Sequence, residues 1–239
     1  MTVAGDTARA GRKKGLRRGA KIRKLSAGKT KKTSFLIKLA EKVALWEIIA
    51  IFAAKFYQLI RNMKRILILA SSPRRGGNSD LLAEQFAKGA ETAGHSVETL
   101  YLRDLRIFFC RGCQACRTMG YCVIRDSVSK ILNKLMFADV ICFASPVYFY
   151  SVNGAMKTFL DRCLPLYGRM KNKDFYYMVT AEDDNPTNLA RAFEAFDGFA
   201  DCFNDVRCMG RIYGAGADKK GDIQKTYAYT EAFEMGKNV

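Results

Sequence analysis

The segment Lys64–Asp80, KRILILASSPRRGGNSD, contains the pattern that decides the fold. Its run ILILA holds no polar residue, which is typical of a strand buried on both faces of a parallel sheet. A serine-, arginine- and glycine-rich stretch follows and predicts a tight loop. Ser79–Gly94 then has apolar residues at helical spacing. The segment therefore predicts a strand, a loop and a helix.

The same alternation of strand and helix continues to the end of the chain. Further strands are predicted at Ser96–Leu102, Ala138–Pro146, Asp174–Ala181 and Val206–Tyr213. Further helices are predicted at Val128–Phe137, Gly154–Leu164, Asn185–Phe203 and Asp222–Met235. Five such strands predict an α/β fold, a parallel sheet with helices on both faces. Ligands of such sheets bind beyond the carboxyl ends of the strands, where the strand order reverses. The loops after the first, third and fourth predicted strands are therefore the candidate site.

The chain has 239 residues and a formal charge of +17, but the charge is concentrated before the predicted sheet. Met1–Arg65 contains 18 Lys and Arg against three acidic residues, whereas Ile66–Val239 contains 22 against 20. Residues 1–33 are basic and poor in large apolar side chains, so they are predicted to form a disordered arm. Residues 34–62 contain no Gly or Pro and predict a helix that is apolar on nearly all sides. Residues 63–239 form the predicted globular domain.

Three interpretations of the predicted helix 34–62 remain open. In the first interpretation, the helix docks on the domain or on a second subunit. In the second, it lies in a membrane interface with its basic neighbours facing anionic lipid. In the third, it spans a bilayer. Val43–Ile60 offers 18 residues with two charges, which is short and polar for a span. A solvated arm without a partner is a further alternative for the basic tail. The near-neutral body gives no reason to expect nucleic acid as a partner. No cleavage site of the secretory kind is found, so a cytoplasmic location is expected, with membrane-surface contact through the helix left open.

The loop after the first strand has the composition of an anion-binding loop. Its hydroxyl and cationic donors are Ser71, Ser72, Arg74, Arg75 and Ser79. Gly76 and Gly77 allow backbone amides to turn inward, and Asn78 or Ser79 is predicted to cap the next helix. The loop matches neither the glycine pattern of nucleotide triphosphatases nor that of dinucleotide folds. An ordinary capped turn is the alternative.

The loop after the third strand is rich in aromatic residues. Tyr148, Phe149 and Tyr150 follow Pro146 at the end of that strand. Flat rings stack on planar heterocycles. The alternative is that these three rings do no more than cover the edge of the sheet. An anion loop beside an aromatic wall predicts a flat, phosphorylated ligand.

Several segments together resemble one known family. ASSPRRGGNSD, ASPVYFYS and the dipeptide Asp161–Arg162 are similar to the flavodoxin-like, FMN-binding NAD(P)H oxidoreductases, and most of all to the branch that includes the iron–sulfur flavoproteins. The later segment Tyr213–Ile223, YGAGADKKGDI, and the terminal EMGKNV also resemble that branch. The resemblance covers Lys64–Val239 and implies a flavodoxin-like five-stranded sheet.

The resemblance also implies a cofactor and its contacts. FMN is expected with its phosphate on Ser72, Arg74, Asn78 and Ser79. Its ring is expected against Pro146, Val147, Tyr148 and Phe149. A third contact is expected at Thr180 and Ala181, followed by Glu182 and Asp183, where many such reductases have glycines. NAD(P)H is the implied electron donor, and a homodimer or homotetramer the implied assembly.

Four of the eight cysteines lie in CRGCQACRTMGYC, Cys110–Cys122. A cytoplasmic chain is not expected to keep stable disulfides there. Zinc is an alternative, although three ligands at this spacing crowd one another. The resemblance implies that Cys110, Cys113, Cys116 and Cys122 ligate a 4Fe-4S cluster close to the flavin. A cluster-free loop of structural or redox-active thiols is the third alternative.

These features predict an oxidoreductase that moves electrons from NAD(P)H or a reduced carrier to an unknown acceptor, through the cluster if there is one. No acid–base catalyst is expected, because a flavin needs position and electrostatics more than proton transfer. His95, the single histidine, is expected at the surface and far from the site. The alternative function is a non-catalytic redox module or sensor tethered by its basic arm. Turnover of a reduced nicotinamide separates the two.

Overall fold

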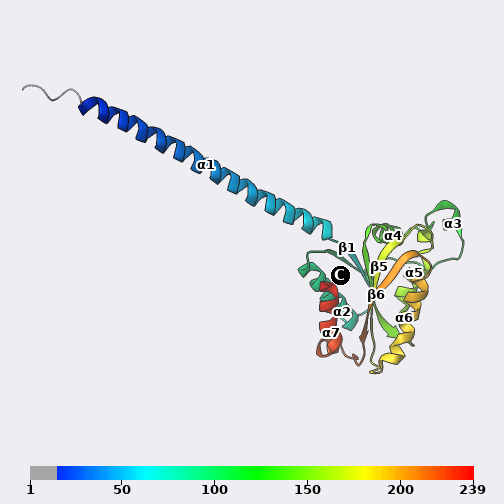
Figure 1. Ribbon diagram of the computed structural model, residues 1–239. Coiled ribbons are helices and arrows are strands. Elements are labelled where there is room, and N and C mark those ends of the chain that lie inside the picture. The colour runs from blue at the N-terminus through cyan, green and yellow to red at the C-terminus, as the bar shows by residue number, and fades with distance from the viewer. Residues whose placement is uncertain (1–14) are drawn as a thin grey trace, which may run out of the picture. The chain divides into compact units, whose positions relative to one another are not determined.

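The computed structural model describes residues 15–239, and the chain divides into two units between Arg61 and Asn62. Within the described residues, the first unit is one helix, α1 (Gly15–Asn62), which ends one residue beyond the boundary (Figure 1). The helix therefore begins well before Ser34, where the sequence predicted it to start. Leu, Ala, Lys and Arg are good helix formers and no proline interrupts them, which accounts for the extension through the segment expected to be disordered. The expected disorder of residues 1–14 lies outside the described residues.

Helix α1 leaves large apolar side chains uncovered along its described length. All side chains of residues 32–58 are exposed, and Trp46, Phe52 and Tyr57 are each 70% exposed. The exposed large apolar side chains of α1 lie on all sides of the helix rather than along one stripe. Among the residues that can be described, no helix is both long enough and apolar enough to cross a membrane.

The second unit is built on a parallel sheet with strand order β2-β1-β3-β5-β6. The strands are β1 (Arg65–Ala70), β2 (Ser96–Tyr101), β3 (Val140–Tyr148), β5 (Lys171–Thr180) and β6 (Asn204–Gly214). A short strand, β4 (Ser151–Val152), pairs antiparallel with the end of β3. The five predicted strands are thus confirmed. Because β2 and β3 lie on opposite sides of β1, the strand order reverses at β1, and the predicted site lies beside this point.

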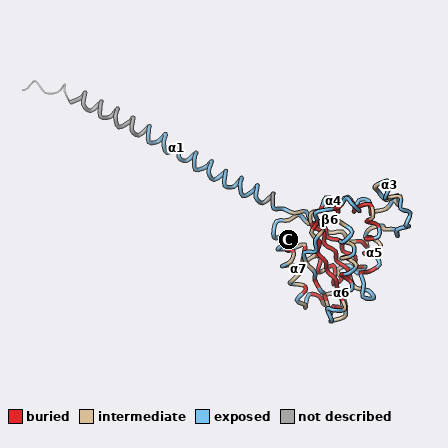
Figure 2. The backbone as a smooth tube through the Cα atoms, turned by 45° about the vertical axis from the view of Figure 1, so that its right-hand side comes forward, coloured by how far each residue is buried: buried red, intermediate tan, exposed pale blue. Residues whose placement is uncertain are grey.

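Helices cover both faces of the sheet (Figure 1). They are α2 (Asn78–Thr92), α4 (Val128–Phe137), α5 (Gly154–Asp161), α6 (Pro186–Ala200) and α7 (Tyr227–Lys237). Alternate residues of β1 point to the two faces: Ile68 packs in a core under α2 and α7, and Leu69 in a core with α4, α5 and α6. Both cores are visible as the buried centre of the unit in Figure 2.

Three short turns of 3-10 helix and one short α-helix complete the second unit. They are η1 (Leu102–Asp104), α3 (Ala115–Met119), η2 (Leu164–Leu166) and η3 (Asp222–Lys225). Helix α3 lies within the cysteine segment, which the sequence predicted to be a loop throughout. The closing helix predicted at Asp222–Met235 is divided into η3 and α7, with Thr226 extended between them.

Helices α2 and α7 approach each other closely enough to require glycine at the contact. A Cβ added to Gly89 would lie 2.0 Å from the carbonyl oxygen of Phe233, and one added to Gly236 would lie 2.1 Å from that of Phe86. A methyl group cannot be accommodated at either distance unless the helices move apart. The two glycines therefore set the spacing between α2 and α7.

Gly89→Ala is expected to lower the free energy of unfolding by about 1–3 kcal/mol, the usual cost of overpacking a core. Urea denaturation measures it. Gly198→Ala is the matched control, because Gly198 lies within helix α6 and a Cβ there meets nothing within 4 Å. The control is expected to be neutral or stabilising, since alanine is the better helix former. Equal stability of the two variants would contradict the close contact of α2 and α7.

Candidate functional site

A pocket of about 200 Å³ lies at the carboxyl ends of β1, β3 and β5, where the sequence placed the site. Its lining residues are Ser72, Arg74, Gly77, Asn78 and Ser79 after β1, Pro146, Val147 and Tyr148 on β3, Thr180 at the end of β5 with Ala181 and Glu182 after it, and Ala217 and Asp218 after β6. Nine of the ten residues predicted to bind the cofactor are among them, and Phe149 is the exception. The structure therefore brings these residues together, and their role as cofactor ligands stays a prediction.

The first turn of α2 supplies the backbone donors of the pocket. Gly77 is the N-cap and has no side chain that could accept a hydrogen bond from the helix, and Asn78 and Ser79 are the first helical residues. The prediction that Asn78 or Ser79 caps the helix is therefore wrong. The amides of a first helical turn have no acceptor within the helix, and the helix dipole adds positive potential there. An anion in the pocket would meet both.

The Asn78 side chain holds a distant loop rather than facing a ligand. Its Nδ2 donates to the carbonyl oxygens of Ala217 and Lys219, each at 3.0 Å, and its Oδ1 accepts from the Gly221 amide at 3.0 Å. These bonds connect the start of α2 to the loop after β6, which adds Ala217 and Asp218 to the pocket. Ala217 and Asp218 were not among the residues predicted for the site, although their segment is one of those that resemble the family.

A buried ion pair fixes the shape of the anion loop. Asp80, 1% exposed, accepts from the Gly76 amide at 2.9 Å and pairs with Arg103 at 2.9 Å. Arg103 also donates to the carbonyl oxygen of Ser72 at 3.0 Å. Gly76 has a φ of +62°, a value that favours glycine. Asp80 and Arg103 thus fix the backbone of the loop through Gly76 and Ser72, and other groups of the loop line the pocket.

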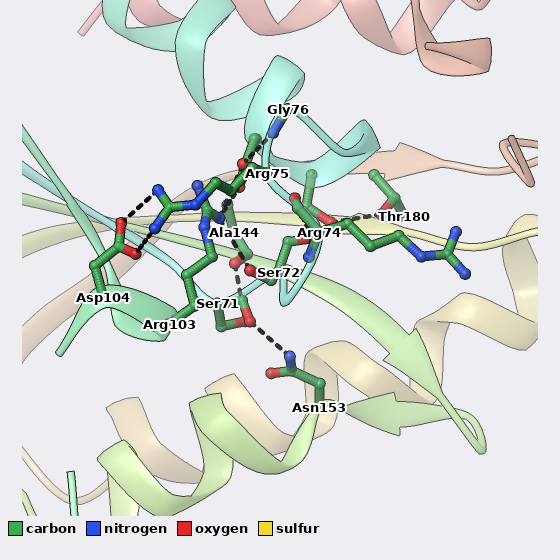
Figure 3. Close-up of polar contacts among 12 residues, drawn as sticks. Ser71, Ser72, Arg74, Arg75, Gly76, Arg103, Asp104, Ala144, Asn153 and Thr180 are labelled. Carbon is green, nitrogen blue, oxygen red and sulfur yellow. Dashed lines mark hydrogen bonds and ion pairs between the residues drawn. The ribbon is translucent and has the colours of Figure 1, made fainter. Parts of the chain in front are cut away.

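The two arginines of the loop point in opposite directions (Figure 3). Arg75 forms an ion pair with Asp104 and does not line the pocket. Arg74 lines the pocket, and no ion pair of Arg74 occurs within the described part of the chain. Of the two arginines, Arg74 is therefore the one placed to neutralise an anion bound at the N-terminus of α2.

The aromatic loop is a hairpin that joins β3 to β4. Its two turn residues, Phe149 and Tyr150, have φ values of 50° and 62°, as a two-residue turn between twisted strands requires. Phe149 is fully exposed at the tip. The Arg191 guanidinium lies over the ring of Tyr150, with its Cζ 5.4 Å from the ring centroid. Tyr148 alone of the three aromatic residues lines the pocket. The predicted wall of three rings is therefore reduced to one, because the turn carries the other two away.

The hairpin is also joined to the anion loop through Asn153. Its Nδ2 donates to the carbonyl oxygen of Ser71 at 2.7 Å, and its Oδ1 accepts from the Met156 amide at 3.1 Å as the cap of α5. Ser79 and Thr180 share a hydrogen bond of 2.7 Å between their hydroxyl oxygens. The loops after β1, β3 and β5 are thus linked to one another by side chains. The pocket has one cationic side, at Arg74, and two carboxylates, those of Glu182 and Asp218.

The four clustered cysteines lie in the segment between η1 and α4. Cys110 and Cys113 are exposed, Cys116 and Cys122 are half-buried, and all are free thiols. Burial raises the pKa of the Cys116 thiol, and the neighbouring charges of Cys122, Cys113 and Cys110 raise it further. Four thiols suit soft metals and iron–sulfur clusters. As they are placed, however, no three His, Cys, Asp or Glu side chains in the described residues could hold a metal ion.

His95 has no part in the pocket, as expected, but it is half-buried rather than a free surface residue. Its Nδ1 accepts from the Lys64 amide at 3.3 Å, and its Nε2 lies 3.1 Å from the carbonyl oxygen of Val239. It therefore joins the segment before β1 to Val239, two residues after the end of α7.

Comparisons with known proteins agree with this geometry. The family model for NADPH-dependent FMN reductases matches residues 64–199. An iron–sulfur flavoprotein of Archaeoglobus fulgidus is 39% identical over 106 residues, 44% of this chain and 47% of the relative. One of Methanosarcina thermophila is 32% identical over 108 residues, 45% of this chain and 56% of the relative. The chain thus spans about half the length of these curated relatives.

Solved structures show the same fold at low sequence identity. An NAD(P)H:quinone oxidoreductase from Methanothermobacter marburgensis superposes with a TM-score of 0.57 and 17% identity, covering 74% of this chain and 96% of that one. An azoreductase from Bacillus anthracis gives a TM-score of 0.57 and 15% identity, covering 74% of this chain and all of the other. The flavodoxin-like fold predicted from the sequence is confirmed.

Proposed function

The chain belongs to the NADPH-dependent FMN reductase family, and we propose that its second unit is an FMN-dependent oxidoreductase. It would take electrons from NAD(P)H or a reduced carrier and pass them to an acceptor. One observation carries the proposal: the free helix N-terminus of α2, Arg74 and the flat side chain of Tyr148 meet in one pocket at the reversal of strand order. FMN, when bound, supplies the hydride and electron chemistry, and the protein supplies position and electrostatics.

The residues of the pocket fit a flavin phosphate on one side. The amides of Asn78 and Ser79, the Ser72 hydroxyl and the Arg74 guanidinium are the donors available to a phosphoryl group. Gly77 lies beside these donors, where a larger residue would be crowded, because a Cβ there would come within 3.0 Å of the carbonyl oxygen of Arg74. Asn78 contributes through its amide alone, since its side chain is engaged elsewhere.

The other side of the pocket suits a flat ring. Pro146, Val147 and Tyr148 would face the ring, and Thr180 and Ala181 would border it. Glu182, which follows Thr180 and Ala181, brings negative charge to this side, which disfavours an anionic ligand close to it. It therefore favours binding in which the phosphate lies toward Arg74. Phe149, which points away from the pocket, is withdrawn as a ring contact.

Arg74→Ala is expected to weaken FMN binding by about 1.5–3 kcal/mol, the value of one charged hydrogen bond. Titration calorimetry of the metal-free chain measures it. Arg75→Ala is the matched control, because Arg75 follows Arg74 in the chain but pairs with Asp104 outside the pocket. An Arg74→Ala variant with the affinity of the Arg75→Ala variant would remove Arg74 from the site.

Turnover tests the enzymatic part of the proposal. The FMN-loaded chain is expected to oxidise NADH or NADPH repeatedly when a quinone or another electron acceptor is present. Binding of FMN without sustained oxidation, under oxygen-free conditions and with several acceptors, would favour the non-catalytic redox module instead.

We propose further that Cys110, Cys113, Cys116 and Cys122 ligate a 4Fe-4S cluster. The soft donor set of four free thiols in one short segment and the names of the curated relatives support this. The thiols would have to move closer together to form the site. Iron and sulfide analysis after oxygen-free purification tests the idea. Flavin without iron would refute the cluster, and a zinc content of one per chain would point to the zinc alternative.

Helix α1 is proposed to contact an anionic membrane surface, with the second unit in the cytoplasm and paired with a second copy. Its exposed apolar side chains and the basic residues before them support this. The full chain is expected to float with vesicles of anionic lipid, and to float less with neutral vesicles or at high salt. Recovery of all the protein in the soluble fraction would contradict membrane contact, and light scattering of that fraction would then report self-association.

A further inference from the structure

Arg162 and Asp126 form the most deeply buried ion pair among the described residues. Their side chains are 1% and 0% exposed. Arg162 is the C-cap of α5, and its two terminal nitrogens meet the two carboxylate oxygens of Asp126 at 2.7 and 3.1 Å. Burying such a pair costs much of the attraction between its charges, so it is weak evidence for stability alone. Its position suggests a specific task.

The pair holds both ends of the cysteine segment. Arg162 donates to the carbonyl oxygen of Phe108 at 2.6 Å and to that of Ile124 at 3.5 Å. Asp126 accepts from the amides of Phe108 at 2.9 Å and Val128 at 3.0 Å. Phe108 comes two residues before Cys110, and Ile124 two residues after Cys122. The segment that carries the four thiols therefore leaves and re-enters the fold at one ion pair.

Two arginines contact the segment, one of them buried and the other exposed. The Nε of Arg162 is buried and has no partner in the described part of the molecule. A second arginine, Arg169, donates to the carbonyl oxygen of Gly120 at 2.8 Å, but in an exposed position. Arg162 is thus the buried contact of this segment, and Arg169 the exposed one.

We propose that Arg162 is the positioning residue of the four-cysteine segment: bound to Asp126, it fixes the register of the segment's two ends. This rests on the proposed role of the cysteines as metal ligands. An arginine is suited to the task, because its planar fork keeps its charge and reaches a carboxylate and two carbonyl oxygens at once. Lysine keeps the charge but lacks the fork.

Two substitutions of Arg162 test the proposal in the full chain. Arg162→Lys keeps a cation beside Asp126, and the double variant Arg162→Gln/Asp126→Asn removes both charges together, so neither leaves a bare buried carboxylate. Arg169→Gln is the matched control on the exposed contact. Three quantities are measured under argon: cobalt(II) affinity of the reduced, metal-free chain from its thiolate absorption, amide hydrogen exchange of residues 109–123, and FMN affinity.

Both Arg162 variants are expected to bind cobalt(II) at least tenfold more weakly than the unchanged chain. Their 109–123 amides are expected to exchange at least tenfold faster, and their FMN affinity to stay within twofold. Arg169→Gln is expected to change cobalt affinity less than threefold. Unchanged exchange and cobalt affinity in Arg162→Lys and the double variant would overturn the proposal. So would loosening of the segment that appears only together with loss of FMN binding, because Arg162 would then support the whole domain.

The exchange measurement separates this inference from the proposed cluster. If the unchanged chain retains no iron and binds no cobalt, the cysteines are not metal ligands and the cluster proposal fails. The effect of the Arg162 variants on exchange within residues 109–123 then decides by itself whether Arg162 positions the segment.

Discussion

Gly77→Asp should abolish tight FMN binding while the domain stays folded. Gly77 is the N-cap of α2, with φ −71° and ψ 173°, a conformation that any residue adopts. Aspartate is a good N-cap and its charge suits the helix dipole, so the variant should fold. The new carboxylate would compete with the phosphate for the same amides. The dissociation constant for FMN is expected to rise about 100-fold, or about 2.7 kcal/mol.

Gly77→Asn is the matched control for this prediction. It has the same shape and crowds the same neighbours, since a Cβ at Gly77 comes within 3.1 Å of the Ser72 hydroxyl oxygen. It lacks only the negative charge, so the difference between the two variants measures the repulsion of the phosphate. Binding is expected to be at least about tenfold tighter in the Asn variant, which corresponds to about 1.4 kcal/mol. Equal affinities in calorimetry would show that no anion binds at this helix terminus.

Arg162→Ala is expected to lower the free energy of unfolding by about 3–5 kcal/mol at neutral pH, because it leaves the Asp126 carboxylate buried without its cation. The double variant Arg162→Gln/Asp126→Asn is expected to lose much less, since no bare charge remains. Urea denaturation of both variants measures the difference. Similar losses in the two would mean that packing, and not the unpaired carboxylate, dominates the penalty.

The penalty of Arg162→Ala should also depend on pH. Burial raises the pKa of Asp126, but the hydrogen bond from Arg162 and those from the Phe108 and Val128 amides lower it overall. In the unchanged chain this group therefore stabilises the fold above the usual aspartate pKa, and the contribution is lost as pH falls through the lowered value. Without Arg162 the effect of burial is less opposed and the pKa rises. Protonation of Asp126 on acidification then relieves the variant, whose deficit should shrink as the pH falls.

The sheet and the position of the pocket were predictable from the sequence because both depend on local patterns. An unbroken apolar run such as ILILA in β1 predicts a buried parallel strand, and the reversal of strand order places the ligand loops. Most of the predicted pocket residues lie where these patterns put them. The helix N-terminus was likewise indicated by the serine- and glycine-rich loop.

Details that depend on distant partners were not predictable. Arg74 and Arg75 are neighbours in the sequence, and only the position of Asp104 decides which one faces the pocket. The engagement of Asn78 depends on a loop more than 130 residues later, at Ala217. Phe149 is directed outward by the tight turn between β3 and β4. A consecutive run of three aromatic residues does not reveal such a turn.

Arg162 shows the same limit for the cysteine segment. The Asp161–Arg162 dipeptide was noted for its resemblance to a family, but nothing in its sequence context indicated that the arginine is buried. Its burial depends on Asp126, 36 residues earlier. The extent of α1 was also missed, because a basic composition was taken as a sign of disorder although its residues are good helix formers.

The central claim is that the N-terminus of α2 and Arg74 bind the phosphate of a flavin. Calorimetric titration of the full, cofactor-free chain with FMN and with riboflavin, which lacks the phosphate, tests it most directly. One FMN is expected to bind per chain, at least about 100-fold more tightly than riboflavin, a difference of about 2.7 kcal/mol. No binding of FMN to the folded chain, or equal binding of the two flavins, would contradict the claim.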